Sequence, residues 1–87
     1  MGDVIVTYRI MPEGTEVPMD QLQDAVKKVG QGAKRMEVVE QPFAFGLKVL
    51  IVKLIVPDGS GLTDKIEEQL GKLPGVSSVE CLELGLV

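Results

Sequence analysis

Histidine and tryptophan are absent from this sequence of 87 residues, and cysteine occurs once. Without histidine the chain lacks the usual general base near neutral pH and the commonest metal ligand, which argues against hydrolytic enzymes and metalloenzymes. One cysteine, Cys81, excludes an intramolecular disulfide and a cysteine zinc cluster, and it favours a cytoplasmic location. We therefore expect no catalytic residue, no metal site and no cofactor, and we expect Cys81 to be a small apolar filler.

Positive charge and long apolar runs are also scarce. Nine lysines and arginines face thirteen acidic residues, which gives a net charge of −4. Such a surface repels phosphate backbones and argues against direct binding of nucleic acid. The run from Val49 to Val52 is far shorter than the roughly 20 apolar residues that span a bilayer, so no membrane segment is expected.

Hydrophobic periodicity predicts six elements in the order βαββαβ. Residues at alternate positions from Val4 to Ile10 are apolar or aromatic, which is typical of a half-buried strand. Leu62, Ile66 and Leu70 recur at helical spacing, with Ser60 or Thr63 expected as the cap. The predicted strands cover 4–11, 33–40, 45–56 and 76–87, and the predicted helices cover 18–29 and 62–73.

This order predicts an α+β fold, the ferredoxin-like βαββαβ plait, with a four-stranded antiparallel sheet and two helices on one face. The length allows only one domain, residues 1–87. We expect the strand order 4-1-3-2, with the turn 41–46 and the tail 84–87 together at one end of the sheet. In the last strand, alternation puts Leu82, Leu84 and Leu86 on one face and Val79 and Cys81 on the other.

The third predicted strand is apolar on both faces, although helices can cover only one face of such a sheet. A protein partner or a weak homodimer would cover the second face. Shielding by loops or by the twist of the sheet is the alternative, since isolated apolar surface residues are common.

The sequence Phe43-Ala44-Phe45-Gly46 in the predicted turn holds two of the three aromatic residues. It partly resembles the aromatic signature of RNA-recognition motifs, but the basic residue that leads that signature is missing. We expect Phe43 to close the hairpin end of the core. Phe45 stands beside a glycine at a hairpin tip, so its ring can project as an anchor while the backbone approaches a partner closely.

Four stretches of the chain match the pattern of one known family: Glu40 to Leu50, Val56 to Asp58, Asp64 to Leu70, and Gly75 to Glu80. Through these stretches the chain resembles the guanine-nucleotide exchange domain of the elongation factor 1-beta family over nearly its whole length. The resemblance implies a guanine-nucleotide exchange factor that binds GDP-loaded elongation factor 1-alpha and speeds GDP release without binding the nucleotide itself. The alternatives are a small-ligand-sensing module or an RNA-binding module on the same fold.

The resemblance also implies which residues contact the partner. In the family, an aromatic residue followed by glycine docks into the GTPase, and here these positions are Phe45 and Gly46, with Ala44 and Lys48 adjoining. Eukaryotic members place a lysine next to last in the chain, where it disturbs the partner's magnesium site. This chain has Leu86 there, followed by Val87, so its tail offers apolar bulk in place of a cation.

Overall fold

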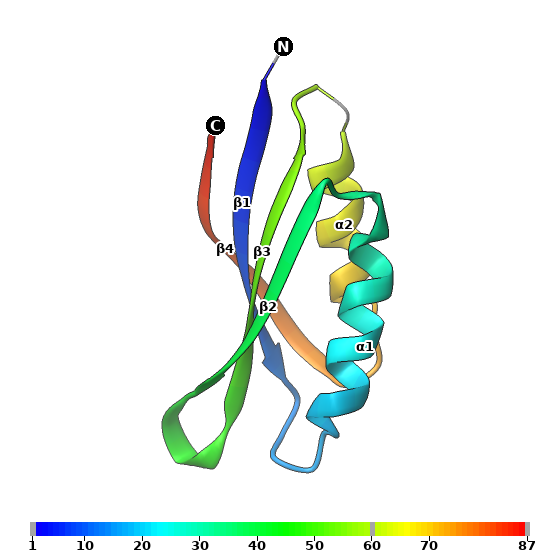
Figure 1. Cartoon of the computed structure of the whole chain (residues 1–87). Helices are drawn as coiled ribbons and strands as arrows, with labels where there is room; N and C mark the ends of the chain where they lie inside the picture. The colour runs from blue at the N-terminus through cyan, green and yellow to red at the C-terminus, as the bar shows by residue number, and fades with distance from the viewer. Residues whose placement is uncertain (1, 60, 87) are drawn as a thin grey trace.

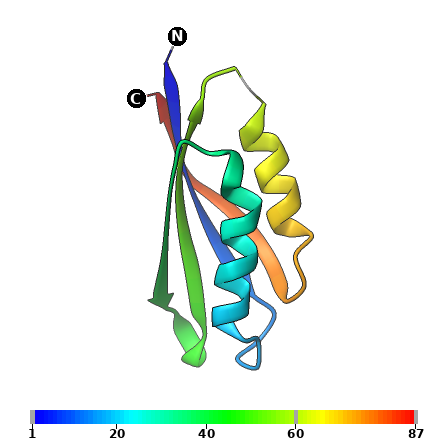
Figure 2. The same ribbon diagram turned by 45° about the vertical axis from the view of Figure 1, so that its right-hand side comes forward.

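A computed structural model describes residues 2–59 and 61–86 of the chain. The strands form one antiparallel sheet in the order β2-β3-β1-β4, which is the expected order. Both helices pack on the same face of this sheet (Figures 1 and 2), as the ferredoxin-like plait requires. The elements are β1 (Asp3–Pro12), α1 (Met19–Val29), β2 (Arg35–Pro42), β3 (Lys48–Pro57), α2 (Leu62–Gly71) and β4 (Val76–Leu86).

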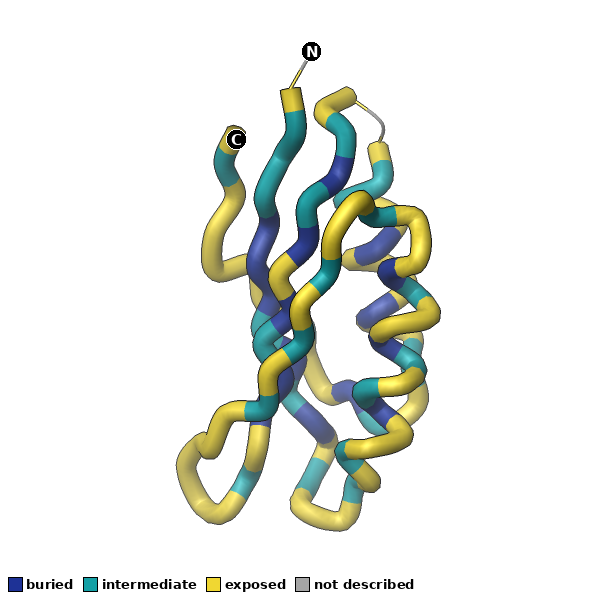
Figure 3. Tube along the Cα trace, viewed as in Figure 1, coloured by how far each residue is buried: buried dark blue, intermediate teal, exposed yellow. Residues whose placement is uncertain are grey.

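The core lies between the sheet and the helices, because alternate residues of the strands meet the apolar stripe of each helix. Figure 3 shows the buried residues of β1 and β3 beside those of α1 and α2. The predicted periodicities of the first strand and of both helices are thereby confirmed. The buried cluster consists of Val6, Tyr8, Ile10, Leu22, Val26, Leu50, Val52, Leu54, Val56, Ile66, Leu70 and Val76.

The cap predicted for the second helix is wrong at Thr63, and Ser60 lies outside the described residues. The capping position is Gly61, and among the described residues no side-chain capping hydrogen bond is formed there. Gly61 has a φ of 73°, a left-handed conformation that glycine adopts without steric penalty.

The hairpin between β2 and β3 differs from the prediction at both of its strands. β2 continues to Pro42, and β3 begins at Lys48 instead of Phe45. Residues 44–46 form a short 3₁₀ turn in which Phe45 has a φ of 61° and a ψ of 30°. Because this left-handed conformation is incompatible with a strand, Phe45 lies at the tip of the hairpin rather than inside β3.

The predicted meeting of the hairpin and the C-terminal tail at one end of the sheet is wrong. Pro42 pairs with Lys48 at the hairpin end, whereas Leu86 pairs with Val4 at the far end. β1 runs antiparallel to β3 and β4 runs antiparallel to β1, so β4 ends where β3 ends. Figure 1 shows the C-terminus beside the N-terminus and far from the hairpin. Eight steps along β3 place the two ends about 25 Å apart.

The face assignment of β4 is also wrong, because a β-bulge interrupts its alternation. The register against β1 shifts between Thr7 and Tyr8, and this shift leaves Leu82 without a partner in β1. A bulge of one residue inverts the faces of all residues beyond it. Val79, Cys81, Leu84 and Leu86 consequently share the helix side of the sheet. Cys81 is nevertheless exposed, so it is not the apolar filler that we expected.

Candidate functional site

The tip of the β2–β3 hairpin carries the most exposed large apolar side chain among the described residues. The Phe45 side chain is 95% exposed. The amide of Phe43 donates to the Leu47 carbonyl at 2.7 Å, and the Leu47 amide donates to the Ala44 carbonyl at 3.2 Å. These hydrogen bonds close the turn, and Gly46 continues it with a φ of 77°. The turn therefore holds the aromatic ring in solvent on a defined backbone.

Phe45 occupies a conformation that aromatic residues rarely adopt. It is the only residue other than glycine with a positive φ in the described part of the chain. A left-handed residue with a side chain costs about 1–2 kcal/mol relative to a right-handed one. In the free chain the exposed ring is not buried, so burial does not offset this conformational strain. Strain of this kind is typical of functional sites.

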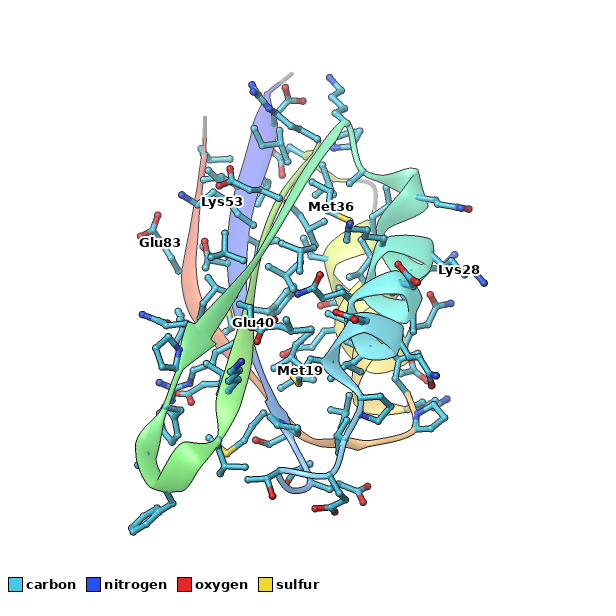
Figure 4. All side chains as sticks on the ribbon, turned by 60° about the horizontal axis from the view of Figure 1, so that its bottom comes forward. Met19, Lys28, Met36, Glu40, Lys53 and Glu83 are labelled. Carbon is cyan, nitrogen blue, oxygen red and sulfur yellow. The ribbon has the colours of Figure 1, made fainter. Side chains whose placement is uncertain are left out.

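Lys48 anchors the base of the hairpin to the helix layer. Its Nζ lies 3.1 Å from Oε1 of Glu40, and Nε2 of Gln23 in α1 donates to Oε2 of Glu40 at 3.3 Å. Figure 4 shows Glu40 among the side chains of the hairpin end. Sequence reasoning missed Glu40 and Gln23. Correct strand ends would have indicated the Glu40–Lys48 pair, since the two residues are diagonal neighbours across β2 and β3.

Phe43 does not close the core, contrary to the prediction. Its side chain is 41% exposed, and the guanidinium carbon of Arg9 lies 5.5 Å from its ring centroid. Arg9 also forms an ion pair with Glu80 of β4. Arg9 lies between the core residues Tyr8 and Ile10 of β1, so its side chain points to the sheet face opposite the helices. Its contacts with Phe43 and Glu80 therefore lie on that face.

The second face of the sheet is open among the described residues, since both helices lie on the other side (Figure 2). Val49 is buried on this face, and Ile51 and Ile55 of β3 are half-buried there. Neighbouring side chains thus shield part of the apolar surface of β3. Coverage of the remainder by a partner or by a second copy stays a prediction.

The C-terminal half of β4 carries further exposed apolar side chains. Leu82, Leu84 and Leu86 are 46%, 63% and 75% exposed. β4 is an edge strand and pairs only with β1, so its outer backbone groups are free of sheet pairing. Val87, which we also assigned to the partner-contacting tail, lies outside the described residues.

Tyr8 is an ionisable residue with a structural role in the core. Burial, followed by the nearby carboxylate of Glu67, raises the pKa of Tyr8 to about 12. The Tyr8 hydroxyl donates to the Thr63 carbonyl at 3.1 Å and so joins β1 to the start of α2.

Within residues 2–59 and 61–86, no group of three or more acidic or cysteine side chains gathers as a metal site. No helix of that part has the length and apolar character to cross a membrane.

Comparison with known proteins identifies the class of this domain. A family model described as "EF-1 guanine nucleotide exchange domain" matches residues 5–87. The match covers all of the strands and helices described above except the first two residues of β1, and it includes the hairpin with Phe45. The fold and the match together define a guanine nucleotide exchange domain.

Relatives named "Elongation factor 1-beta" cover nearly the whole chain. The relative from Methanosarcina acetivorans is 44% identical over 85 residues, which cover 95% of this chain and 96% of the relative. The one from Methanoregula boonei is 38% identical, with 99% of each chain covered. The one from Archaeoglobus fulgidus is 33% identical, with 100% of each chain covered. The chain therefore belongs to the elongation factor 1-beta family, and this membership supports a nucleotide exchange role in translation elongation.

Proposed function

We propose that the chain promotes replacement of GDP by GTP on elongation factor 1-alpha and that it contacts this GTPase through the β2–β3 hairpin. The family match supports the reaction, and the 95% exposure of Phe45 carries the assignment of the site. A buried aromatic anchor commonly provides a large share of the binding energy of a protein interface. Such a partner places the protein in the cytoplasm.

An exchange factor accelerates GDP release by stabilising the nucleotide-free state of its partner. Binding energy at the interface offsets the contacts that GDP and its metal ion lose, and the coupling between the two ligands is reciprocal. The exchange factor needs no catalytic side chain for this task. It needs a rigid surface that prefers one conformation of the partner, and the closed hairpin with its pinned base provides such a surface.

The hairpin residues act together in this proposal. Phe45 inserts its ring into the partner, while Ala44 and Gly46 allow close approach of the backbone. Lys48 adjoins the tip and is oriented by Glu40. Phe43 borders the contact from the open sheet face, where it is stacked on Arg9.

Leu86 and Val87 contact the partner at a separate place, since the end of β4 lies about 25 Å from the hairpin. Leu86 is an exposed apolar side chain where eukaryotic members of the family have a lysine. The tail therefore does not displace the magnesium ion of the partner with a cation. Two routes remain open, namely steric pressure from Leu86 and Val87 and a domain movement within the GTPase.

The test follows labelled GDP as it leaves purified elongation factor 1-alpha, with and without this protein. We expect release to become faster as the concentration of the protein rises, up to a plateau. Release at the unassisted rate over the whole concentration range would contradict the proposal. Measured binding of RNA or of a small ligand in the same preparation would instead favour one of the alternative modules.

A further inference from the structure

A preformed groove lies beside the hairpin end of the molecule, between the start of α1 and the loop that joins α2 to β4. Its volume of about 450 Å³ falls within the range of sites that hold a side chain or a small ligand. The walls are mostly apolar. Six of the lining residues are Glu16, Val17, Pro18, Leu22, Ala25 and Pro74.

Two loops from distant parts of the chain hold this groove open. The Glu13 amide donates to the Gly75 carbonyl at 2.9 Å. Gly75 has a φ of 87°, and a Cβ at this position would lie only 3.0 Å from Cγ1 of Val17. The close approach of Gly75 to Val17 fixes the two loops against each other. A partner would therefore find the groove already formed, with little ordering entropy left to lose.

The groove is continuous with the hairpin through Val17. This residue also lines a smaller cleft of about 160 Å³, whose opposite side is formed by Gly46 and Lys48. Figure 1 shows the hairpin, the β1–α1 loop and the α2–β4 loop at the same end of the molecule. A protein bound to the Phe45 tip thus lies within reach of the groove.

The charges around the groove indicate the chemistry of its occupant. Glu16 is the only charged residue in the lining, Glu13 belongs to the same loop, and Asp20 occupies the first turn of α1. An apolar cavity with an acidic rim fits an apolar side chain that has a lysine or arginine beside it.

We propose that this groove is a second docking site for the GTPase that the hairpin contacts, and that it receives an apolar side chain flanked by a basic residue. The inference rests on the proposed function and extends its contact surface from the hairpin to α1. The partner then contacts the hairpin on one side of Val17 and the groove on the other. These two contacts restrain rotation of the partner about the Phe45 anchor.

The test fills the groove without changing the hairpin. Ala25→Trp places a large side chain in the cavity from α1, where Ala25 is half-buried. Lys27→Trp is the matched control, because two residues further along a helix the side chain points about 200° away. Glu16→Lys, at an exposed loop position, reverses the charge of the rim. Affinity for purified elongation factor 1-alpha and acceleration of GDP release are measured for all three variants.

We expect Ala25→Trp and Glu16→Lys each to weaken binding about tenfold and Lys27→Trp to change it less than twofold. Melting curves check that Ala25→Trp is folded, and Glu16→Lys tests the groove without adding bulk to the helix. Wild-type affinity in both groove variants would overturn the inference while leaving the proposed function intact. Unchanged affinity together with loss of a dimer in sedimentation would assign the groove to a second copy and also overturn it. A wild-type chain that fails to bind the GTPase would overturn both proposals.

Discussion

Leu86 lies opposite Val4 in the sheet, at the end farthest from the β2–β3 hairpin. The two surfaces that we assign to the partner are therefore separate, and no single pocket of the partner receives both. Each surface has its own task in this arrangement. Under the proposed function, the hairpin supplies affinity, and the tail acts where the partner holds its nucleotide and metal ion.

Deletion of Leu86 and Val87 should slow GDP exchange more than it weakens binding. The hairpin and its base are unchanged in the truncated chain, so most of the affinity remains. The rate of labelled GDP release and the dissociation constant of the complex give the comparison. Losses of equal size in both quantities would show that the tail only contributes affinity.

Substitution of Phe45 by a residue that tolerates a left-handed backbone should separate stability from function. The ring is 95% exposed and buries almost nothing, whereas its φ of 61° costs about 1–2 kcal/mol. We expect Phe45→Asn to raise the free energy of unfolding by up to about 1 kcal/mol and to impair exchange. Urea denaturation measures the first effect. Phe45→Ala, which keeps the strain, is the control and should be no more stable than the wild type.

The two glycines around the end of α2 should respond oppositely to alanine. Gly75→Ala introduces a Cβ at a φ of 87° and 3.0 Å from Val17, so we expect a loss of about 1–2 kcal/mol. Gly71 is the last residue of α2, and an added Cβ there would meet no neighbouring atom within 4 Å. Gly71→Ala should add up to about 1 kcal/mol, because alanine favours the helix. Stabilisation by both substitutions would mean that the Gly75–Val17 contact does not constrain the loops.

Ionisation of Tyr8, the only tyrosine in the sequence, should lower the free energy of unfolding at alkaline pH. Burial raises the pKa of Tyr8 to about 12, above the ordinary value of about 10 for an unfolded chain. Between these values the unfolded chain loses the proton first, so stability decreases as the pH rises. Because tyrosine occurs once and tryptophan is absent, near-ultraviolet absorbance reports this group alone. A midpoint near 10 in the folded protein would contradict the burial of the hydroxyl.

Tyr8→Phe completes this test. The variant loses the hydrogen bond to the Thr63 carbonyl, which should lower stability by about 1 kcal/mol at neutral pH. It should also lose less stability than the wild type between pH values of about 10 and 12. Chemical denaturation at several pH values measures both effects.

Periodicity predicted the parts of the fold that burial determines. The core face of β1 and the apolar stripes of both helices follow from regular spacing, and these gave the fold class and the strand order. Alternation failed where the backbone is irregular. The unpaired Leu82 inverted the faces of β4, and the left-handed Phe45 shortened β3 at its start.

The candidate site was predicted in part. Phe45 was expected to be exposed because it precedes a glycine at a turn, and its exposure is confirmed. The placement of the tail beside it was wrong, although the predicted antiparallel order already requires β4 to end at the edge of the sheet opposite the hairpin. The groove around Val17 could not be predicted, since it depends on contact between two loops that are far apart in the sequence and are joined by the hydrogen bond from Glu13 to Gly75.

The most direct test of the central claim compares wild-type protein with Phe45→Ala in the release of labelled GDP from elongation factor 1-alpha. Val39→Ala, which truncates an exposed apolar residue of β2 away from the tip, is the control. Truncation of a central aromatic anchor should cost about 2 kcal/mol of affinity, which corresponds to a roughly thirtyfold higher concentration for half-maximal stimulation. The control should behave as the wild type. Stimulation by Phe45→Ala at wild-type concentrations would contradict the claim that the Phe45 ring docks into the GTPase.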